Sequence, residues 1–180
     1  MFEGEGAGIK SRLPFRLFST LPICQKIPPN SVLFFTINII FSGGAVAVDL
    51  ASRLENSTKI RCLMVENTFT SIPEVAKSLF NLKFVRCLPR WFYKNQFLSR
   101  LKVPRLTVPV MFLSGTADQL IPPNMATELY NATSSETKQL ARFPGGSHNE
   151  TWMCSHYYQT IEYFLDEVNM DIYYYLVDPK

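Results

Sequence analysis

The stretch PVMFLSGTADQLIPP, residues 109–123, shows the pattern on which the fold of this chain depends. An apolar run rich in β-branched and aromatic residues ends at Gly115, Asp118 follows in a turn, and two prolines then open a helix that ends near Asn131. Short apolar runs bounded by glycine are typical of buried strands, and proline is common in the first turn of a helix. The stretch therefore predicts a strand, a loop and a helix in succession.

The same alternation extends in both directions along the chain. The sequence predicts four strands, at residues 32–41, 60–66, 109–115 and 137–143. It predicts helices at 45–54, 71–81, 122–131 and 151–168, and a turn at 55–58. Alternating strands and helices predict the α/β class, with a mainly parallel sheet flanked by helices on both faces. Four strands are fewer than a doubly wound enzyme sheet usually has.

The composition fits one globular domain. The chain has 180 residues, and 47% apolar against 18% charged residues excludes an intrinsically disordered protein. We expect a poorly ordered arm at 1–30, one domain at 31–170 and a tail at 171–180.

A net charge of +3 does not indicate nucleic acid as a partner. The four cysteines show no CxxC spacing, so we predict reduced, packed thiols and neither a zinc site nor a redox motif.

Residues 32–48 allow a second interpretation, a membrane-spanning helix. No charged residue occurs between Lys26 and Asp49, and the apolar part is near the lower length limit for a spanning helix. Asn38 and two adjacent glycines favour a buried strand followed by a helix instead. Hydropathy alone does not separate these two structures, so the stretch is also a candidate membrane anchor.

Three polar residues follow the predicted strands, at the end of the strands where function collects in an open parallel sheet. Ser42 precedes two glycines, Asp118 follows the strand at 109–115, and His148 follows the last strand. A serine hydroxyl needs an adjacent base before it acts as a nucleophile, and histidine can take and return that proton near neutral pH. A carboxylate fixes the imidazole tautomer. These three residues are the candidate catalytic residues.

Four motifs stand at the predicted strand ends and helix starts: GGAVA at 43–47, MVENTFTSIP at 64–73, SGTADQLIPP at 114–123 and FPGGSHNETW at 143–152. A fifth, YKN at 93–95, lies in a segment without clear periodicity. Together they resemble the carboxyl-terminal half of an α/β-hydrolase. The resemblance implies that fold, with Asp118 and His148 as the acid and the base of a catalytic triad and with no metal or cofactor. It also implies a membrane-tethered serine hydrolase that cleaves ester or thioester bonds of lipids or palmitoylated proteins.

The chain departs from this family at the nucleophile. The family motif reads Gly-Arg-Ser-Leu-Gly-Gly-Ala, and alignment on the two glycines puts Phe41 at the serine position and Ser42 at the leucine. A turn that slips by one residue would restore Ser42. Ile40 would then occupy a glycine position of this strained turn.

Residues 1–40 do not resemble the family, so its first strands and the loop that supplies one oxyanion-hole donor are expected to be missing. We therefore expect a truncated and impaired hydrolase. The alternative is a non-catalytic, hydrolase-derived remnant or binding scaffold, since a half-sheet exposes an unpaired edge that a partner would cover. Glu66 is expected in an ion pair. The aromatic residues at 84–97 are expected in core or cap packing, with the wall of an acyl pocket as the alternative.

Overall fold

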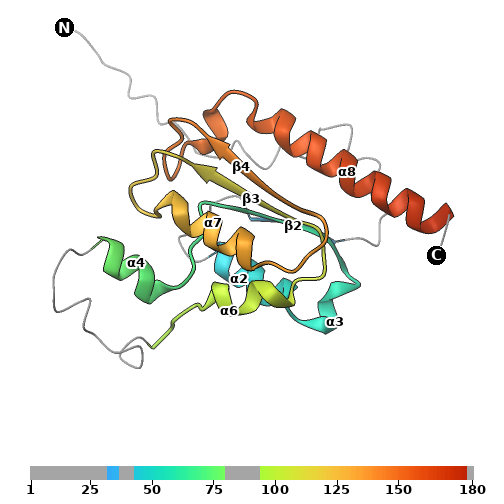
Figure 1. Ribbon diagram of the computed structural model, residues 1–180, viewed down its shortest axis with the longest axis horizontal. Helices are drawn as coiled ribbons and strands as arrows, with labels where there is room; N and C mark the ends of the chain where they lie inside the picture. The colour runs from blue at the N-terminus through green and yellow to red at the C-terminus, as the bar shows by residue number, and fades with distance from the viewer. Residues whose placement is uncertain (1–31, 37–42, 80–93, 178–180) are drawn as a thin grey trace, which may run out of the picture.

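The computed structural model describes residues 32–36, 43–79 and 94–177, with side chains described for 43–79 and 94–168. The described strands form one parallel sheet in the order β1-β2-β3-β4 (Figure 1). Their bounds are β1 (Val32–Thr36), β2 (Ile60–Glu66), β3 (Val110–Gly115) and β4 (Lys138–Phe143). The predicted α/β class and parallel sheet are confirmed, and the strand order follows the chain order.

Helices connect the strands and cover both faces of the sheet. Helix α8 lies on one face, and α2, α6 and α7 lie on the other (Figure 1). The bounds are α2 (Gly43–Ala51), α3 (Leu54–Ser57), α4 (Ile72–Leu79), α6 (Ser99–Lys102), η3 (Val103–Arg105), α7 (Pro123–Ala132), η4 (Thr151–Met153) and α8 (Tyr157–Val177). Helix α4 begins where the sequence predicts, because the Ser71 hydroxyl accepts the Glu74 N–H at 3.3 Å and caps its first turn.

Alternate residues of the two central strands fill two separate cores. One side of β3, with Val110 and Phe112, packs against α2 and α7, where Leu129 is fully buried. The other side, with Met111 and Leu113, packs against α8. Successive residues of a strand point to opposite faces, so a strand that is apolar throughout needs a helix layer on each side. This is the reason that β3 carries no charged residue.

Two sequence predictions are corrected by the structure. The turn predicted at 55–58 is the short helix α3. The helix predicted to begin at 151 is interrupted, because His156 has a left-handed backbone (φ 64°) that separates η4 from α8.

The stretch 32–48 forms the strand β1 and the start of the helix α2, with residues 37–42 outside the described part of the chain. The strand-then-helix interpretation therefore agrees with the two segments that the structure describes. None of the helices in the described part of the chain combines the length and the apolarity needed to cross a membrane.

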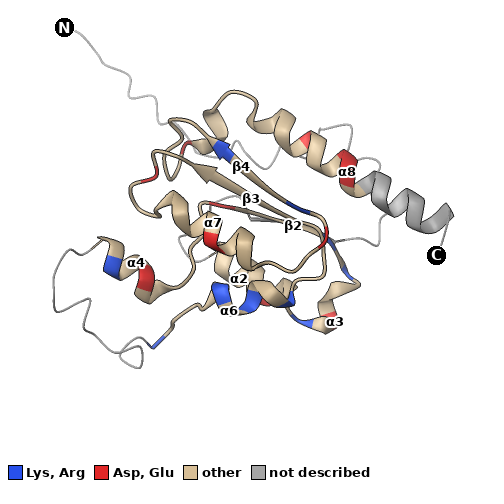
Figure 2. Ribbon diagram, viewed as in Figure 1, with Lys and Arg blue, Asp and Glu red and all other residues tan. Residues whose placement is uncertain are grey.

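Charged residues lie mainly on the helices, with others in loops and on β2 and β4 (Figure 2). Asp49 joins two helices of one layer, since its carboxylate contacts Lys102 at 2.6 Å and Arg53 at 2.7 Å. The hydrogen bond from Lys102 is the main reason that the pKa of Asp49 is lowered from its ordinary value. These contacts are partly exposed and hold α2 beside α6 with modest energy.

Candidate active site

Asp118 lies in the loop after β3, and this loop fixes the direction of its carboxylate. The side chain is only 1% exposed. Its Oδ1 accepts the backbone N–H groups of Leu120 and Ile121, each at 2.8 Å. Aspartate commonly makes this turn with the backbone two residues ahead. Because Oδ1 is held by the turn, Oδ2 remains for a partner from another loop.

That partner is His148, in the loop after β4. Its Nδ1 lies 2.7 Å from Oδ2 of Asp118. A ring nitrogen that faces a carboxylate carries the proton, so the lone pair of the neutral imidazole is on Nε2. The His148 side chain is 13% exposed and lines a hollow of about 420 Å³ together with Gln119 and Asn149. A buried carboxylate behind a partly accessible imidazole is the arrangement of a general base.

The two loops that carry this pair are packed backbone to backbone. A Cβ on Gly115 would lie 2.4 Å from the backbone oxygen of Gly146 and 2.5 Å from Oγ1 of Thr151. The N–H of Ala117 donates to the same Gly146 oxygen at 2.9 Å. Glycine at the end of β3 therefore permits the close approach that brings Asp118 and His148 together.

A fourth buried polar residue, Asn67, connects these loops to the end of β2, and it was not among the predicted site residues. Its Oδ1 accepts the N–H of Gly115 at 2.9 Å. Its Nδ2 donates to the backbone oxygen of His148 at 3.0 Å and to Oγ1 of Thr151 at 2.9 Å. The available signal was an asparagine directly after a strand, where asparagine favours a turn. Its partners are 48 to 84 residues away in the chain, so no local pattern indicates them.

Ser42 lies outside the described residues, as do Ile40 and Phe41, so the nucleophile stays a prediction. The structure describes the helix that begins directly after it. A Cβ on Gly44 would lie 2.5 Å from Oγ1 of Thr68, which places the first turn of α2 against the loop after β2. The first turn of α2, which follows Ser42 in the chain, therefore lies beside the segment that begins with Asn67.

Sequence comparison identifies a family profile and relatives that are similar to this chain. A family profile described as serine aminopeptidase, S33, matches residues 99–151, which include Asp118 and His148. Protein bem46 of Schizosaccharomyces pombe is 31% identical over 166 residues, or 90% of this chain and 51% of that protein. The α/β-hydrolase domain-containing protein WAV2 of Arabidopsis thaliana is 32% identical over 144 residues, or 69% of this chain and 44% of that protein. The chain is therefore similar in sequence to relatives that include an α/β-hydrolase domain-containing protein.

Solved structures share the fold of this chain. An α/β-hydrolase enzyme from a lagoon-sediment metagenome aligns with a TM-score of 0.55 at 13% identity, over 78% of this chain and 63% of that one. Acetyl xylan esterase 1 of Thermoanaerobacterium aligns with a TM-score of 0.51 at 20% identity, over 71% of this chain and 43% of that one. The fold is therefore of the α/β-hydrolase type. The chain spans about half the length of the curated relatives it matches.

Glu66 is the last residue of β2, and the ion pair predicted for it is wrong within the described part of the chain. The residue is 4% exposed, and its partner is the Tyr157 hydroxyl, which donates to Oε2 at 2.8 Å. Burial raises the pKa of Glu66, because the loss of hydration disfavours the carboxylate more than the bond from Tyr157 favours it. β2 is covered on both faces, so its last residue has little access to water.

Glu66→Gln is expected to change how stability depends on pH. The folded protein binds the proton of the Glu66 carboxyl more tightly than the unfolded chain does. The free energy of unfolding therefore falls as pH rises from the ordinary glutamate pKa of about 4.3 through the raised pKa of the folded state. Glutamine stays neutral and keeps an oxygen for Tyr157. The free energy of unfolding of the variant should therefore rise relative to that of the unmodified protein as pH increases, by at most about 1.4 kcal/mol per pH unit.

Urea unfolding between pH 4 and pH 8 measures this difference in the free energy of unfolding. Glu55→Gln on the exposed helix α3 is the matched control, because it makes the same chemical change at a residue that is not buried. A constant gap between Glu66→Gln and the unmodified protein over this range would contradict the assignment of burial as the dominant influence on Glu66.

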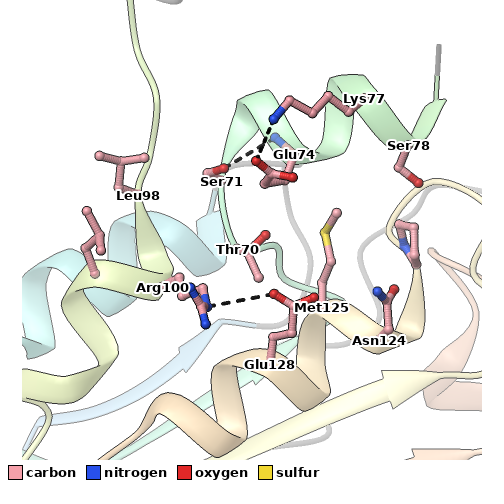
Figure 3. Close-up of a pocket in the computed structure, with 12 residues that line it drawn as sticks. Thr70, Ser71, Glu74, Lys77, Ser78, Leu98, Arg100, Asn124, Met125 and Glu128 are labelled. Atoms are coloured by element: carbon pink, nitrogen blue, oxygen red, sulfur yellow. Dashed lines mark hydrogen bonds and ion pairs between the residues drawn. The ribbon is translucent and has the colours of Figure 1, made fainter. Parts of the chain in front are cut away.

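A second cavity, of about 570 Å³, lies between α4, α6 and α7 (Figure 3). Two ion pairs line it, Lys77 to Glu74 at 3.0 Å and Arg100 to Glu128 at 3.8 Å (Figure 3). Of the aromatic stretch 84–97, residues 84–93 lie outside the described part of the chain. The described walls combine these ion pairs with apolar side chains, Leu98, Leu101 and Met125, and the acyl pocket stays a hypothesis.

The cysteines and the other potential metal ligands of the described residues form no metal-binding cluster. Cys62 and Cys154 are free thiols, which confirms that part of the expectation, whereas Cys24 and Cys87 lie outside the described residues. Burial raises the pKa of Cys62 to about 12. Within residues 43–79 and 94–168, no three histidine, cysteine, aspartate or glutamate side chains come together in a metal-binding arrangement.

Proposed function

We propose that this chain is a serine hydrolase of the acyl-ester and acyl-thioester class, with Asp118 as the acid, His148 as the base and Ser42 as the nucleophile. The observation that carries the proposal is the 2.7 Å contact between Nδ1 of His148 and a carboxylate that is 1% exposed. Burying a carboxylate is costly unless hydrogen bonds compensate for lost hydration. Here two backbone N–H groups and one imidazole supply that compensation.

The proposed reaction uses each group in turn. Nε2 of His148 takes the proton of the Ser42 hydroxyl while the serine oxygen attacks the acyl carbonyl carbon. Asp118 stabilises the imidazolium through Nδ1. The imidazolium then gives its proton to the departing alcohol or thiol, which leaves an acyl-serine. His148 then takes a proton from water while the water oxygen attacks the acyl carbon. The bond from that carbon to the Ser42 oxygen breaks, the imidazolium returns its proton to this oxygen, and the carboxylic acid is released.

The proposed substrates are lipids or lipidated proteins. The motifs at 64–73, 114–123 and 143–152 resemble those of alpha/beta-hydrolase domain-containing protein 13, which supports an acyl substrate. A Saccharomyces cerevisiae relative, 33% identical over 126 residues and covering 43% of that protein, is named an uncharacterized membrane protein. This name supports a proposed membrane-associated location for the present chain.

Covalent labelling with a fluorophosphonate probe tests the proposal, because such probes react with activated serines. The unmodified chain is expected to be labelled, and Ser42→Ala and His148→Ala are expected to abolish labelling. Ser57→Ala is the matched control at a serine remote from the proposed site, whose hydroxyl bonds the backbone oxygen of Leu54, and it should keep full labelling.

The opposite outcome favours the non-catalytic scaffold. A folded chain that takes no label, or that takes label independently of Ser42, would overturn the assignment of the nucleophile. The displaced glycine motif around Ile40 and Ser42 is the sequence feature that would then account for the loss of chemistry.

A further inference from the structure

We infer that Asn67 is the positioning residue that holds His148 against Asp118, an inference that rests on the proposed function. Its carboxamide joins the loops that follow three neighbouring strands. Oδ1 accepts the N–H at the end of β3, and Nδ2 reaches the loop after β4. Asn67 itself stands directly after β2.

The contacts of Asn67 and Asp118 hold His148 at two points. Asp118 holds the imidazole through Nδ1, and Asn67 holds the backbone through the His148 carbonyl oxygen at 3.0 Å. Nδ2 of Asn67 also approaches the Ser147 oxygen at 3.3 Å. A side chain can keep a fixed direction only when its own backbone is fixed. The contact from Asn67 to the His148 carbonyl oxygen therefore fixes the backbone from which the imidazole extends.

Thr151 makes this attachment a closed network. Its Oγ1 accepts from Nδ2 of Asn67 at 2.9 Å and donates to the Ser147 oxygen at 2.8 Å. Thr151 is fully buried and Asn67 is 5% exposed. A buried hydrogen-bonding group that loses its partner destabilises the folded state, so this network resists opening.

The backbone of Asn67 explains the residue type. Its φ of 45° is in the left-handed region, which asparagine and aspartate tolerate better than most residues with a side chain. Glycine would fit the backbone but would supply no carboxamide. Aspartate would fit the backbone and keep the acceptor for Gly115, but it would place a carboxylate against oxygen acceptors. Asparagine alone among these three satisfies both the backbone and all of the contacts.

This comparison designs the test. Asn67→Asp is expected to keep hydrogen-exchange protection of the Gly115 N–H, since an oxygen still faces that group. It is expected to lose most of the intensity of the downfield proton resonance that marks a hydrogen bond between Nδ1 of His148 and Asp118. Asn67→Gly is expected to lose both signals while keeping the backbone conformation. Both signals are read by NMR spectroscopy and need no substrate.

Asn56→Asp is the matched control, because Nδ2 of Asn56 also donates to a backbone oxygen, that of Leu50 at 2.9 Å, but far from this site. It should leave both signals unchanged. If Asn67→Asp does not fold, Asn67→Gly and the pair Thr151→Ser and Thr151→Val still decide the matter. Serine keeps the hydroxyl and should keep the resonance, whereas valine should weaken it.

The outcomes separate this inference from the proposed function. An unchanged resonance in folded Asn67→Asp and Asn67→Gly would overturn the role of Asn67 whatever the activity. A resonance that depends on Asn67 in a chain that takes no fluorophosphonate label would uphold the role of Asn67 as a positioning residue and overturn the proposed nucleophile. Absence of the resonance from the unmodified chain would contradict the His148–Asp118 pair and overturn both.

Discussion

Asp118→Asn is expected to slow ester hydrolysis by about 10⁴-fold, the size of effect seen when the triad carboxylate of a serine protease becomes an amide. The amide oxygen can still accept the N–H groups of Leu120 and Ile121, so the loop should keep its shape. The amide nitrogen would face Nδ1 of His148 and favour the tautomer with the proton on Nε2. That imidazole can no longer accept a proton from serine.

The measurement is the hydrolysis rate of p-nitrophenyl butyrate by the unmodified chain and the variant, with urea unfolding as the check on folding. Asp166→Asn is the matched control, since Asp166 is exposed on α8 and the chemical change is the same. A rate within tenfold of the unmodified chain would show that Asp118 does not set the tautomer of His148.

Phe164→Ala is expected to lower the free energy of unfolding by about 3–5 kcal/mol. Phe164 is fully buried between α8 and the sheet, in one cluster with Met64 and Met111. Removing its ring takes away apolar contact area and leaves a cavity that the neighbouring side chains fill only in part. Folded proteins have total free energies of unfolding of about 5–15 kcal/mol, so this loss would remove a large part of the stability of the domain.

Tyr163→Ala provides the control one residue away on the same helix. Tyr163 is 74% exposed, so its replacement should change the free energy of unfolding by no more than about 0.5 kcal/mol. Urea unfolding of both variants measures the contrast. A loss below about 1 kcal/mol for Phe164→Ala would contradict the packing of α8 on β2 and β3.

Much of the fold could be predicted from the sequence because the two central strands, β2 and β3, are buried on both faces. A buried parallel strand is apolar at nearly every position, so its ends are visible where the run stops, and β2 has the predicted bounds, Ile60–Glu66. The helix boundaries were less accurate. Residues 54–57 form α3 rather than part of a turn, and a left-handed residue at 156 interrupts the last predicted helix. Neither feature alters hydrophobic periodicity, which is the signal that the sequence offers.

The candidate site was predictable only where a residue follows a strand. The structure brings together Asp118 and His148, the two residues predicted on that basis and by resemblance. Asn67 also follows a strand, yet its contacts depend on packing between three loops, which no sequence pattern records. Glu66 was misjudged for a related reason, since its partner Tyr157 is 91 residues away in the chain.

The order of the strands across the sheet is also the order in which a ribosome makes them. Each of β2, β3 and β4 therefore emerges beside a neighbour that has already been synthesised, and within this sheet none has to wait for a later partner. Asp118 is made soon after β3, but its imidazole arrives only after β4 has followed. A nascent chain that stops before His148 would hold these four strands without that imidazole, so the contact between His148 and Asp118 forms only after β4 has been made.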